Sequence, residues 1–237
     1  MIIDFHTHMF PDKIAGRTLD YLSGIFGASP FADGTYTGLC NSMGKGAVDI
    51  SIALPAVTKV SQVASINRFA SAYTEGPVIS FGGIHPECEN YKEILKEIKN
   101  LGLKGIKLHP DYQGFFFDDP RAYPVYERCA DLGLIVVIHA GSDPVSPGVI
   151  HADPQAIARV LDRFPRLILA GQTAGTMCFV ILSANRCIWI QRFPLETSPL
   201  IPRGRSFVRM ARIGSCLAAT VHGTARPWMQ SLSAHWA

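Results

Sequence analysis

Residues 2–8 read "IIDFHTH", a short apolar run that carries two histidines one residue apart. On a β-strand, side chains two residues apart point to the same face, about 6–7 Å from each other. His6 and His8 can therefore converge on one object, and imidazole is a common ligand of divalent metal ions. Asp4 lies one step deeper on that face, where it either supports a metal ligand from behind or serves as a buried structural carboxylate.

Five further apolar runs repeat along the first 170 residues. Their near-continuous apolar composition is typical of parallel strands covered on both faces of a sheet. The runs are "DISIALP" (49–55), "VISFGGIHP" (78–86), "KGIKLHP" (104–110), "LIVVIHAG" (134–141) and "RLILAG" (166–171).

Amphipathic segments fill the gaps between these runs. In "NYKEILKEIKNLG" (90–102), Asn90 is placed to cap a helix that Gly102 ends. In "DPQAIARVLDRFP" (153–165), Asp153 caps and Pro154 takes the first helical position. Repeated βα units of this length predict either a TIM barrel or a doubly wound sheet.

The positions of the histidines favour the barrel. Five of the eight histidines lie at or next to the carboxyl ends of four predicted strands: His6, His8, His85, His109 and His139. In a (β/α)8 barrel these ends form a single mouth, where active sites are built, whereas an open sheet would spread them along a line. We therefore predict an α/β fold, a (β/α)8 TIM barrel whose last strands are atypical or incomplete.

The chain has 237 residues, of which 48% are hydrophobic and 17% charged, and this predicts one globular domain over 1–237. No apolar run reaches the roughly 18 residues of a membrane span, and no secretory leader is recognisable, so we expect a cytoplasmic protein without membrane contact. The six cysteines form no CxxC pair and are expected to be free thiols.

The charge balance changes near Gly171. Residues 1–170 carry 15 Lys and Arg against 18 Asp and Glu, whereas residues 171–237 carry seven Arg, one Glu, no Lys and no Asp. Clustered arginine can mark a nucleic-acid surface. Here it is interleaved with neither lysine nor an aromatic platform, so we expect no nucleic-acid partner.

Three segments resemble a known family. "DFHTH" on the first strand, "IHAG" after the fifth and "HADPQAIARVLDRFPRLILA" leading into the sixth are similar to the amidohydrolase-related branch of the amidohydrolase superfamily, which contains metal-dependent hydrolases and decarboxylases. The resemblance covers roughly residues 1–170. It implies that His6 and His8 are the first-strand metal ligands and His139 the fifth-strand ligand. It also implies a histidine after strand six and a metal-binding aspartate after strand eight.

Both of these last groups are missing. Gly171-Gln172 stands where the family has Ala-His, and "HGTARPW" (222–228) places Ala225 at the aspartate position. A shift of the reading frame near Gly171 would explain the missing ligands and the charge change together, and sequencing the gene tests it. A diverged natural tail is the alternative.

Other polar residues near the strand ends are candidates for binding or catalysis. Lys107 and His109 share a strand face, and either can orient a substrate carboxylate. Lys107 can also be a carboxylated metal bridge or a lysine at the barrel rim. Asp111 either binds substrate or starts a turn. His85 either binds substrate or holds the backbone of its turn. His151 and Asp153 are interpreted as the start of a helix rather than as metal ligands.

The sequence thus predicts a metal-dependent hydrolase that acts on a small carbon–nitrogen, ester or lactone substrate through metal-activated water. The alternatives are a metal-dependent decarboxylase of the same family and an inactive member that lacks the strand-six and strand-eight ligands. The expected cofactor is a divalent metal, zinc or manganese, held by His6, His8 and His139. The expected partner is a small-molecule substrate, and self-association into a homo-oligomer is left open.

Overall fold

A computed structural model describes residues 3–173, 178–183, 186–190, 208–213 and 216–220, with side chains up to Gly171. Each apolar run predicted to be a strand forms one, and the third is divided at Phe81. The strands are β1 (Ile3–Thr7), β2 (Ile50–Ala53), β3 (Val78–Ser80), β4 (Gly82–Gly83), β5 (Gly105–Leu108), β6 (Ile135–Ala140) and β7 (Ile168–Thr173).

These strands pair in parallel and in chain order, β1 to β3 and then β4 to β7. The chain bridges the β3–β4 break through Phe81, whose N–H donates to the Ala53 carbonyl at 2.9 Å. Parallel strands joined by crossover connections are the pattern of a TIM barrel, and the predicted fold class is confirmed.

The pattern changes after β7, as the sequence predicted. β8 (Cys178–Ser183) and β9 (Arg186–Ile190) continue the sheet in antiparallel fashion, and β10 (Val208–Ile213) pairs antiparallel with β11 (Cys216–Thr220). Ala225 lies outside the described residues, as does most of the tail, so the single-domain boundary over 1–237 stays a prediction.

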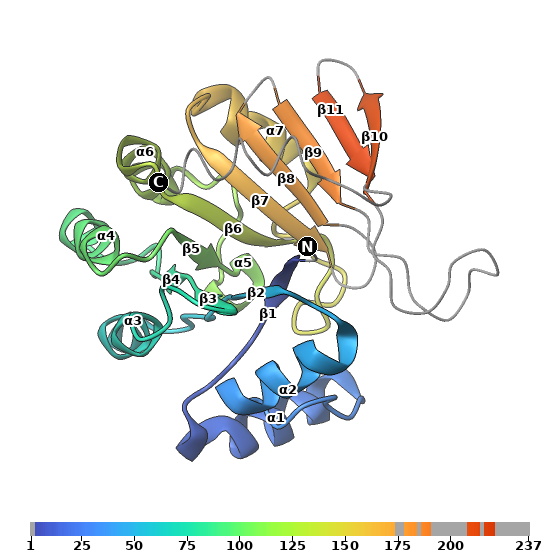
Figure 1. Ribbon diagram of the computed structural model, residues 1–237. Coiled ribbons are helices and arrows are strands. Elements are labelled where there is room, and N and C mark those ends of the chain that lie inside the picture. The colour runs from blue at the N-terminus through green and yellow to red at the C-terminus, as the bar shows by residue number, and fades with distance from the viewer. Residues whose placement is uncertain (1–2, 174–177, 184–185, 191–207, 214–215, 221–237) are drawn as a thin grey trace.

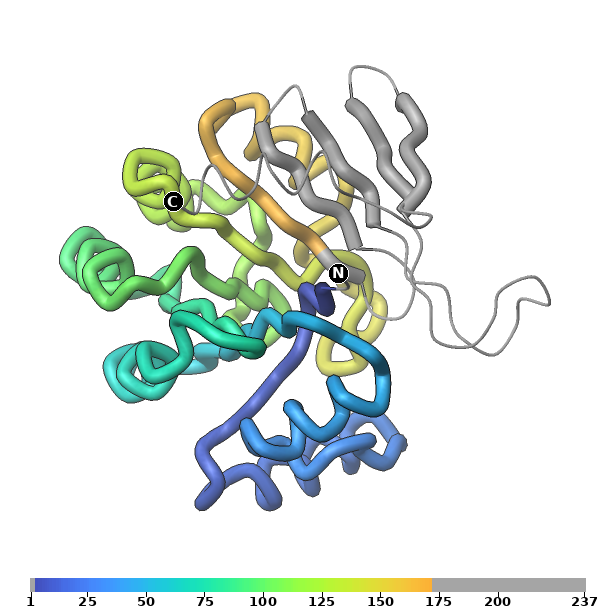
Figure 2. Tube along the Cα trace, in the orientation of Figure 1, coloured from blue at the N-terminus to red at the C-terminus, as the bar shows by residue number. Residues whose placement is uncertain are grey.

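The helices cover the strands from outside, and Figure 1 shows α3, α4 and α6 in succession along one side. The α1–α2 pair, inserted between β1 and β2, lies at another end of the molecule (Figure 2). The helices are α1 (Asp12–Phe26), α2 (Tyr36–Gly46), α3 (Val63–Ala70), α4 (Tyr91–Asn100), α5 (Pro110–Gln113), α6 (Tyr123–Leu132) and α7 (Pro154–Arg163), with 3-10 turns η1 (Val60–Gln62) and η2 (Pro120–Ala122).

The predicted helix starts are confirmed, although one cap differs. Asp153 accepts a hydrogen bond from the Ala156 N–H at 2.7 Å and Pro154 opens α7. Asn90 precedes α4, but its side chain makes no capping hydrogen bond, because its backbone is not in the extended conformation that aims a cap at the helix. In the described part of the chain, every helix is too short or too polar to cross a membrane.

Alternate residues of the strands form two apolar layers. Ile106, Val136 and Leu169 belong to the larger cluster, which packs against the helices. Val137 and Ala170 belong to the inner cluster, and the strand register places Lys107 beside Val137 on the same face. The side chains of Cys40, Cys88 and Cys129 are free thiols, and the other three cysteines lie where side chains are not described.

Candidate metal and substrate site

The two histidines of the first strand converge, as their spacing predicted. The Nε2 atoms of His6 and His8 lie 3.1 Å apart. The Nδ1 of His8 lies 2.7 Å from the Leu54 carbonyl, an acceptor, so Nδ1 carries the proton and Nε2 offers its lone pair. Asp4 accepts a hydrogen bond from the His6 backbone N–H at 3.1 Å, so it steadies the strand end through the backbone.

A second cluster lies at the ends of β5 and β6. His109 follows β5, and His139 is the penultimate residue of β6. Asp143 follows four residues later, in the loop after β6. Asp143 Oδ2 lies 3.3 Å from His139 Nε2 and 3.8 Å from His109 Nε2. These are the three described residues whose ligand atoms gather within 4.8 Å of one another, and all three are buried.

Stacked rings hold the second cluster in place. His109 is sandwiched between Tyr112, at a centroid distance of 3.8 Å, and His139, at 4.4 Å. The His109 ring lies within 5° of the Tyr112 plane and within 7° of the His139 plane. The imidazole planes are therefore set by packing, and both lone pairs can turn to one ion only if a ring leaves the stack.

Burial and neighbouring positive charge lower the pKa values of histidines in both clusters. Burial, His139, Lys107 and His8 together lower the pKa of His109 to about 2. The residue His8 as a whole is exposed at the mouth. Its imidazole ring is nevertheless crowded by protein, and this desolvation together with the Lys107 charge lowers its pKa to about 4. Burial and Lys107 also lower the pKa of His139. All three imidazoles are thus neutral at pH 7, the form that binds metal ions.

Lys107 is fully buried on the inner face of the barrel. A lysine in this position is not solvated at the barrel rim, which was one of the alternatives from sequence. Burial of an ammonium group is costly unless opposite charge or a ligand compensates it. Its position among the histidines leaves the roles of metal bridge and substrate-carboxylate partner as predictions.

Asp111 pairs with a residue 40 positions along the chain. Asp111 Oδ1 lies 2.9 Å from His151 Nδ1, and the Asp111 side chain is 1% exposed against 16% for His151. Its Oδ2 has no hydrogen-bond partner among the described residues. Asp111 contributes to raising the pKa of Tyr112 to about 12, after burial, Asp143 and Tyr21. His151 therefore does more than precede a helix, since it partners a buried carboxylate.

His85 is not among the described residues that gather around His109, and its ring contacts its own turn. Its Nδ1 accepts a hydrogen bond from the Glu87 N–H at 3.3 Å, and its ring is buried against this turn. Burial lowers its pKa, which Glu87 partly offsets. This geometry fits the turn-holding alternative, and a substrate-binding role for His85 stays a prediction.

Gln113 joins three strand ends through one buried amide. Its Oε1 accepts from the His109 N–H at 3.0 Å, and its Nε2 donates to the carbonyls of Val57 and Ile84, both at 2.8 Å. These bonds link the loops after β2, β4 and β5. The position of His109 thus depends on a side chain that carries no metal-binding group.

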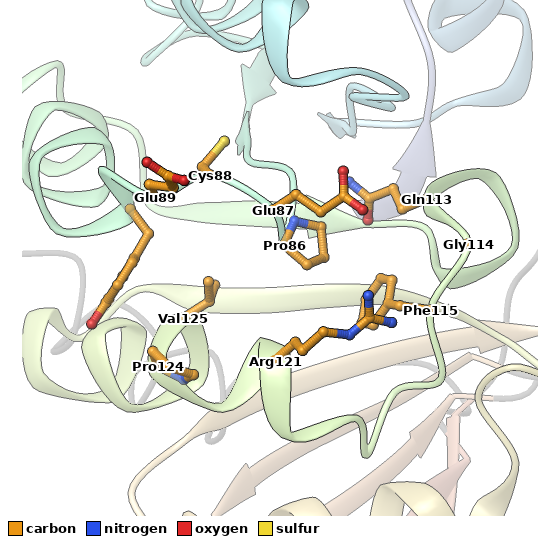
Figure 3. A pocket seen from close by; sticks show the side chains of 11 residues that line it. Pro86, Glu87, Cys88, Glu89, Gln113, Gly114, Phe115, Arg121, Pro124 and Val125 are labelled. Atoms are coloured by element: carbon orange, nitrogen blue, oxygen red, sulfur yellow. The ribbon is translucent and has the colours of Figure 1, made fainter.

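A cavity of about 330 Å³ lies between the loop after β4 and the start of α6, and none of the site histidines lines it. Figure 3 shows side chains from the loop after β4 facing those of η2 and α6 across it. Its lining is mostly apolar, and Gln113 is the site-associated residue that it includes. The lining residues are Pro86, Glu87, Cys88, Glu89, Tyr91, Gln113, Gly114, Phe115, Arg121, Pro124 and Val125.

A comparison with protein-family models identifies the family of the part of the chain that carries these imidazoles. The family model described as "Amidohydrolase" matches residues 3–172. The chain belongs to the amidohydrolase family. The matched range ends at Gln172, whose backbone pairs with His139 across β6 and β7, at the point where the charge balance of the sequence changes.

Named relatives of this amidohydrolase family member include a decarboxylase. The chain is 32% identical over 77 residues to 2-amino-3-carboxymuconate-6-semialdehyde decarboxylase of Dictyostelium discoideum, a match that covers 31% of this chain and 21% of the relative. The chain thus spans about a fifth of that protein, and the whole enzyme's activity does not transfer with the match.

Two solved structures share the fold. An uncharacterised TIM-barrel protein from Bordetella bronchiseptica is 23% identical with a TM-score of 0.54. The match covers 71% of this chain and 65% of that protein. The 5-carboxyvanillate decarboxylase of Novosphingobium aromaticivorans is 16% identical with a TM-score of 0.56, over 72% of this chain and 64% of that one. The latter was solved with manganese and 4-hydroxy-3-methoxy-5-nitrobenzoic acid.

Sequence reasoning missed Asp143 and Gln113. The loop "AGSDPVSPGVIH" (140–151) is recognisable as a mouth loop from its Gly, Pro and Ser content. Within it, the spacing of four residues from His139 to Asp143 was the available signal, but a loop carries no fixed periodicity that would aim the carboxylate. Gln113 lies in a single helical turn and gave no signal at all.

Proposed function

We propose that this protein is a divalent-metal-dependent decarboxylase of small unsaturated or aromatic carboxylates. The observation that carries the proposal is the convergence of His6 and His8, with His8 fixed by Leu54 so that its Nε2 lone pair is available. The decarboxylases named among the relatives favour this activity over hydrolysis, the first interpretation of the sequence.

The residues suit a divalent cation. Two imidazole nitrogens 3.1 Å apart match the spacing of neighbouring ligands around one ion, which is about 3.0–3.4 Å for bond lengths near 2.1 Å. In this proposal His6, His8 and His139 hold the ion, which is manganese or zinc. When bound, a divalent cation acts as a Lewis acid that stabilises negative charge on a substrate oxygen.

The remaining polar residues would act on the substrate. The Lys107 ammonium, buried among the histidines, pairs with a carboxylate or phenolate oxygen of the substrate and holds it. In decarboxylation the bond to the carboxyl group breaks, CO₂ leaves, and the electron pair stays on carbon, which then takes a proton. His151, hydrogen-bonded to Asp111, can hold that proton and release it.

The test uses the full chain, stripped of metal and reconstituted with Mn²⁺ or Zn²⁺. CO₂ release is measured from 5-carboxyvanillate and from 2-amino-3-carboxymuconate-6-semialdehyde, beside hydrolysis of a lactone and an aryl ester panel. We expect metal-dependent CO₂ release that the His6→Ala, His8→Ala double variant abolishes. Asp131→Asn on α6 is the control, because its exposed carboxylate pairs with Arg166.

Two results would contradict the proposal. Metal-dependent hydrolysis without CO₂ release would favour the hydrolase alternative. A folded chain that binds no metal and turns over none of these substrates would favour the inactive alternative, in which the altered tail deprives the barrel of its function.

A further inference from the structure

The imidazoles of the site do not by themselves balance a divalent cation. His6, His8, His109 and His139 are neutral donors, so an ion bound by them alone keeps its full charge beside the buried His109 and His139. Residues 171–237 contain no aspartate, and their single acidic residue is Glu196. A carboxylate from the first 170 residues is therefore the natural source of compensating charge.

We propose that Asp143 is this acidic ligand, and that it binds a divalent metal ion together with His109 and His139. The proposal rests on the metal dependence proposed above and extends the ligand set, since neither His109 nor Asp143 belongs to the ligands that the sequence predicted. The ligand class is a borderline cation such as Zn²⁺ or Mn²⁺, which accepts both imidazole nitrogen and carboxylate oxygen.

The separations match the edges of a coordination polyhedron. Two ligand atoms that are each about 2.1 Å from a tetrahedral centre lie about 3.4 Å apart. Asp143 Oδ2 is 3.3 Å from His139 Nε2 and 3.8 Å from His109 Nε2. The Asp143–His139 separation already has this length, and the three ligand atoms all lie within 4.8 Å of one another, so His109 has to move closer for the three to surround one ion.

The same atoms are not arranged as a hydrogen-bonded pair. His139 Nε2 is buried, and despite the nearby carboxylate it makes no hydrogen bond of acceptable geometry within the described chain. An imidazole and a carboxylate that lie close without pointing at each other are suited to a shared third partner. The Asp143 side chain is 2% exposed, so bulk water is a poor candidate for that partner.

The local structure presents Oδ2 near the two rings. Asp143 uses its other oxygen, Oδ1, to accept from the Val145 N–H at 2.8 Å, which orients the carboxylate within its own loop. His109 and His139 are stacked with near-parallel planes, so one ring has to turn out of the stack before both in-plane lone pairs can point at one ion. The two histidines come from the ends of neighbouring strands, which keeps both side chains at the same edge of the sheet within reach of Asp143.

The experiment measures metal binding directly on the metal-free full chain. Zn²⁺ affinity is measured by competition with a chromophoric chelator, and the absorption spectrum of the Co²⁺ form reports the ligand set. The variants are Asp143→Asn and His109→Gln. Asp119→Asn is the matched control, because Asp119 Oδ1 also accepts from the N–H two residues on, that of Arg121, but on an exposed turn.

We expect Asp143→Asn and His109→Gln each to weaken Zn²⁺ binding by at least about tenfold and to change the Co²⁺ spectrum, whereas Asp119→Asn does neither. Asn keeps the acceptor for Val145, so the loop should stay folded, and circular dichroism of the metal-free variants verifies this. If Asp143→Asn does not fold, His109→Gln tests the same site without altering the loop.

Binding and spectrum unchanged in both variants would overturn the inference. The His6→Ala, His8→Ala variant separates this failure from that of the proposed function. If that variant loses metal while Asp143→Asn keeps it, the metal-dependent function stands and the Asp143 site fails. If the reverse holds, the Asp143 site stands and the assignment of His6 and His8 as ligands fails. If the unaltered chain binds no metal, both fail.

Discussion

Replacing Gln113 by leucine should destabilise the protein strongly, although Gln113 is neither a metal ligand nor part of the apolar core. The residue is 7% exposed, and its amide makes three hydrogen bonds, to the His109 N–H and to the carbonyls of Val57 and Ile84. Leucine has a similar volume but satisfies none of them. Three buried backbone groups then lose their partners.

The magnitude follows from those three groups. A buried backbone group without a partner costs about 1–3 kcal/mol, and partial relaxation of the loops towards water reduces that cost. We therefore expect a loss of about 3–5 kcal/mol in the free energy of unfolding. This is a large share of the roughly 5–15 kcal/mol that domains of this kind possess.

The assay is urea unfolding of the metal-free chain followed by circular dichroism. Gln155→Leu on α7 is the matched control, because Gln155 is exposed and should change the stability by less than about 0.5 kcal/mol. A further variant, Gln113→Glu, keeps an acceptor for His109 but cannot donate to two carbonyls, so it should also be destabilised. A loss below about 1 kcal/mol for Gln113→Leu would refute the reasoning, because it would mean that the loops do not depend on this amide.

Three further outcomes are expected. Tyr126→Phe should cost about 1–2 kcal/mol in urea unfolding, because the buried hydroxyl donates to the Phe117 carbonyl at 2.8 Å; an unchanged midpoint would contradict this. Asp153→Ala should cost about 1 kcal/mol through loss of the α7 cap, whereas Asp153→Asn should be nearly neutral, and equal losses would argue against capping. In the folded chain the pKa of His109 is lowered to about 2, so below about pH 6.5 the unfolded chain binds more protons than the folded one. The metal-free protein should therefore lose stability as the pH falls from about 6.5 towards 4. Thermal melts across this range check the sign, and His109→Gln should flatten the dependence.

The sequence by itself determined the strands and the convergence of the first two histidines. These features follow from local rules, since apolar runs of strand length form buried parallel strands and a spacing of two puts side chains on one face. The confirmed positions of β5, β6 and β7, and the 3.1 Å approach of His6 to His8, are consequences of those rules. The change of pattern after residue 170 was likewise indicated by the switch from a net negative to an arginine-rich composition.

The tertiary structure decided which side chains meet across the mouth. Asp111 pairs with His151, Gln113 reaches Val57, and Asp143 turns back onto His109, although all of these residues lie in loops or in a single helical turn. Such segments have no period that fixes where a side chain points, and their backbone is set by hydrogen bonds to distant strands. The ligand spacing therefore depends on how β5 and β6 pair and how the mouth loop folds over them, which no local pattern in the sequence encodes.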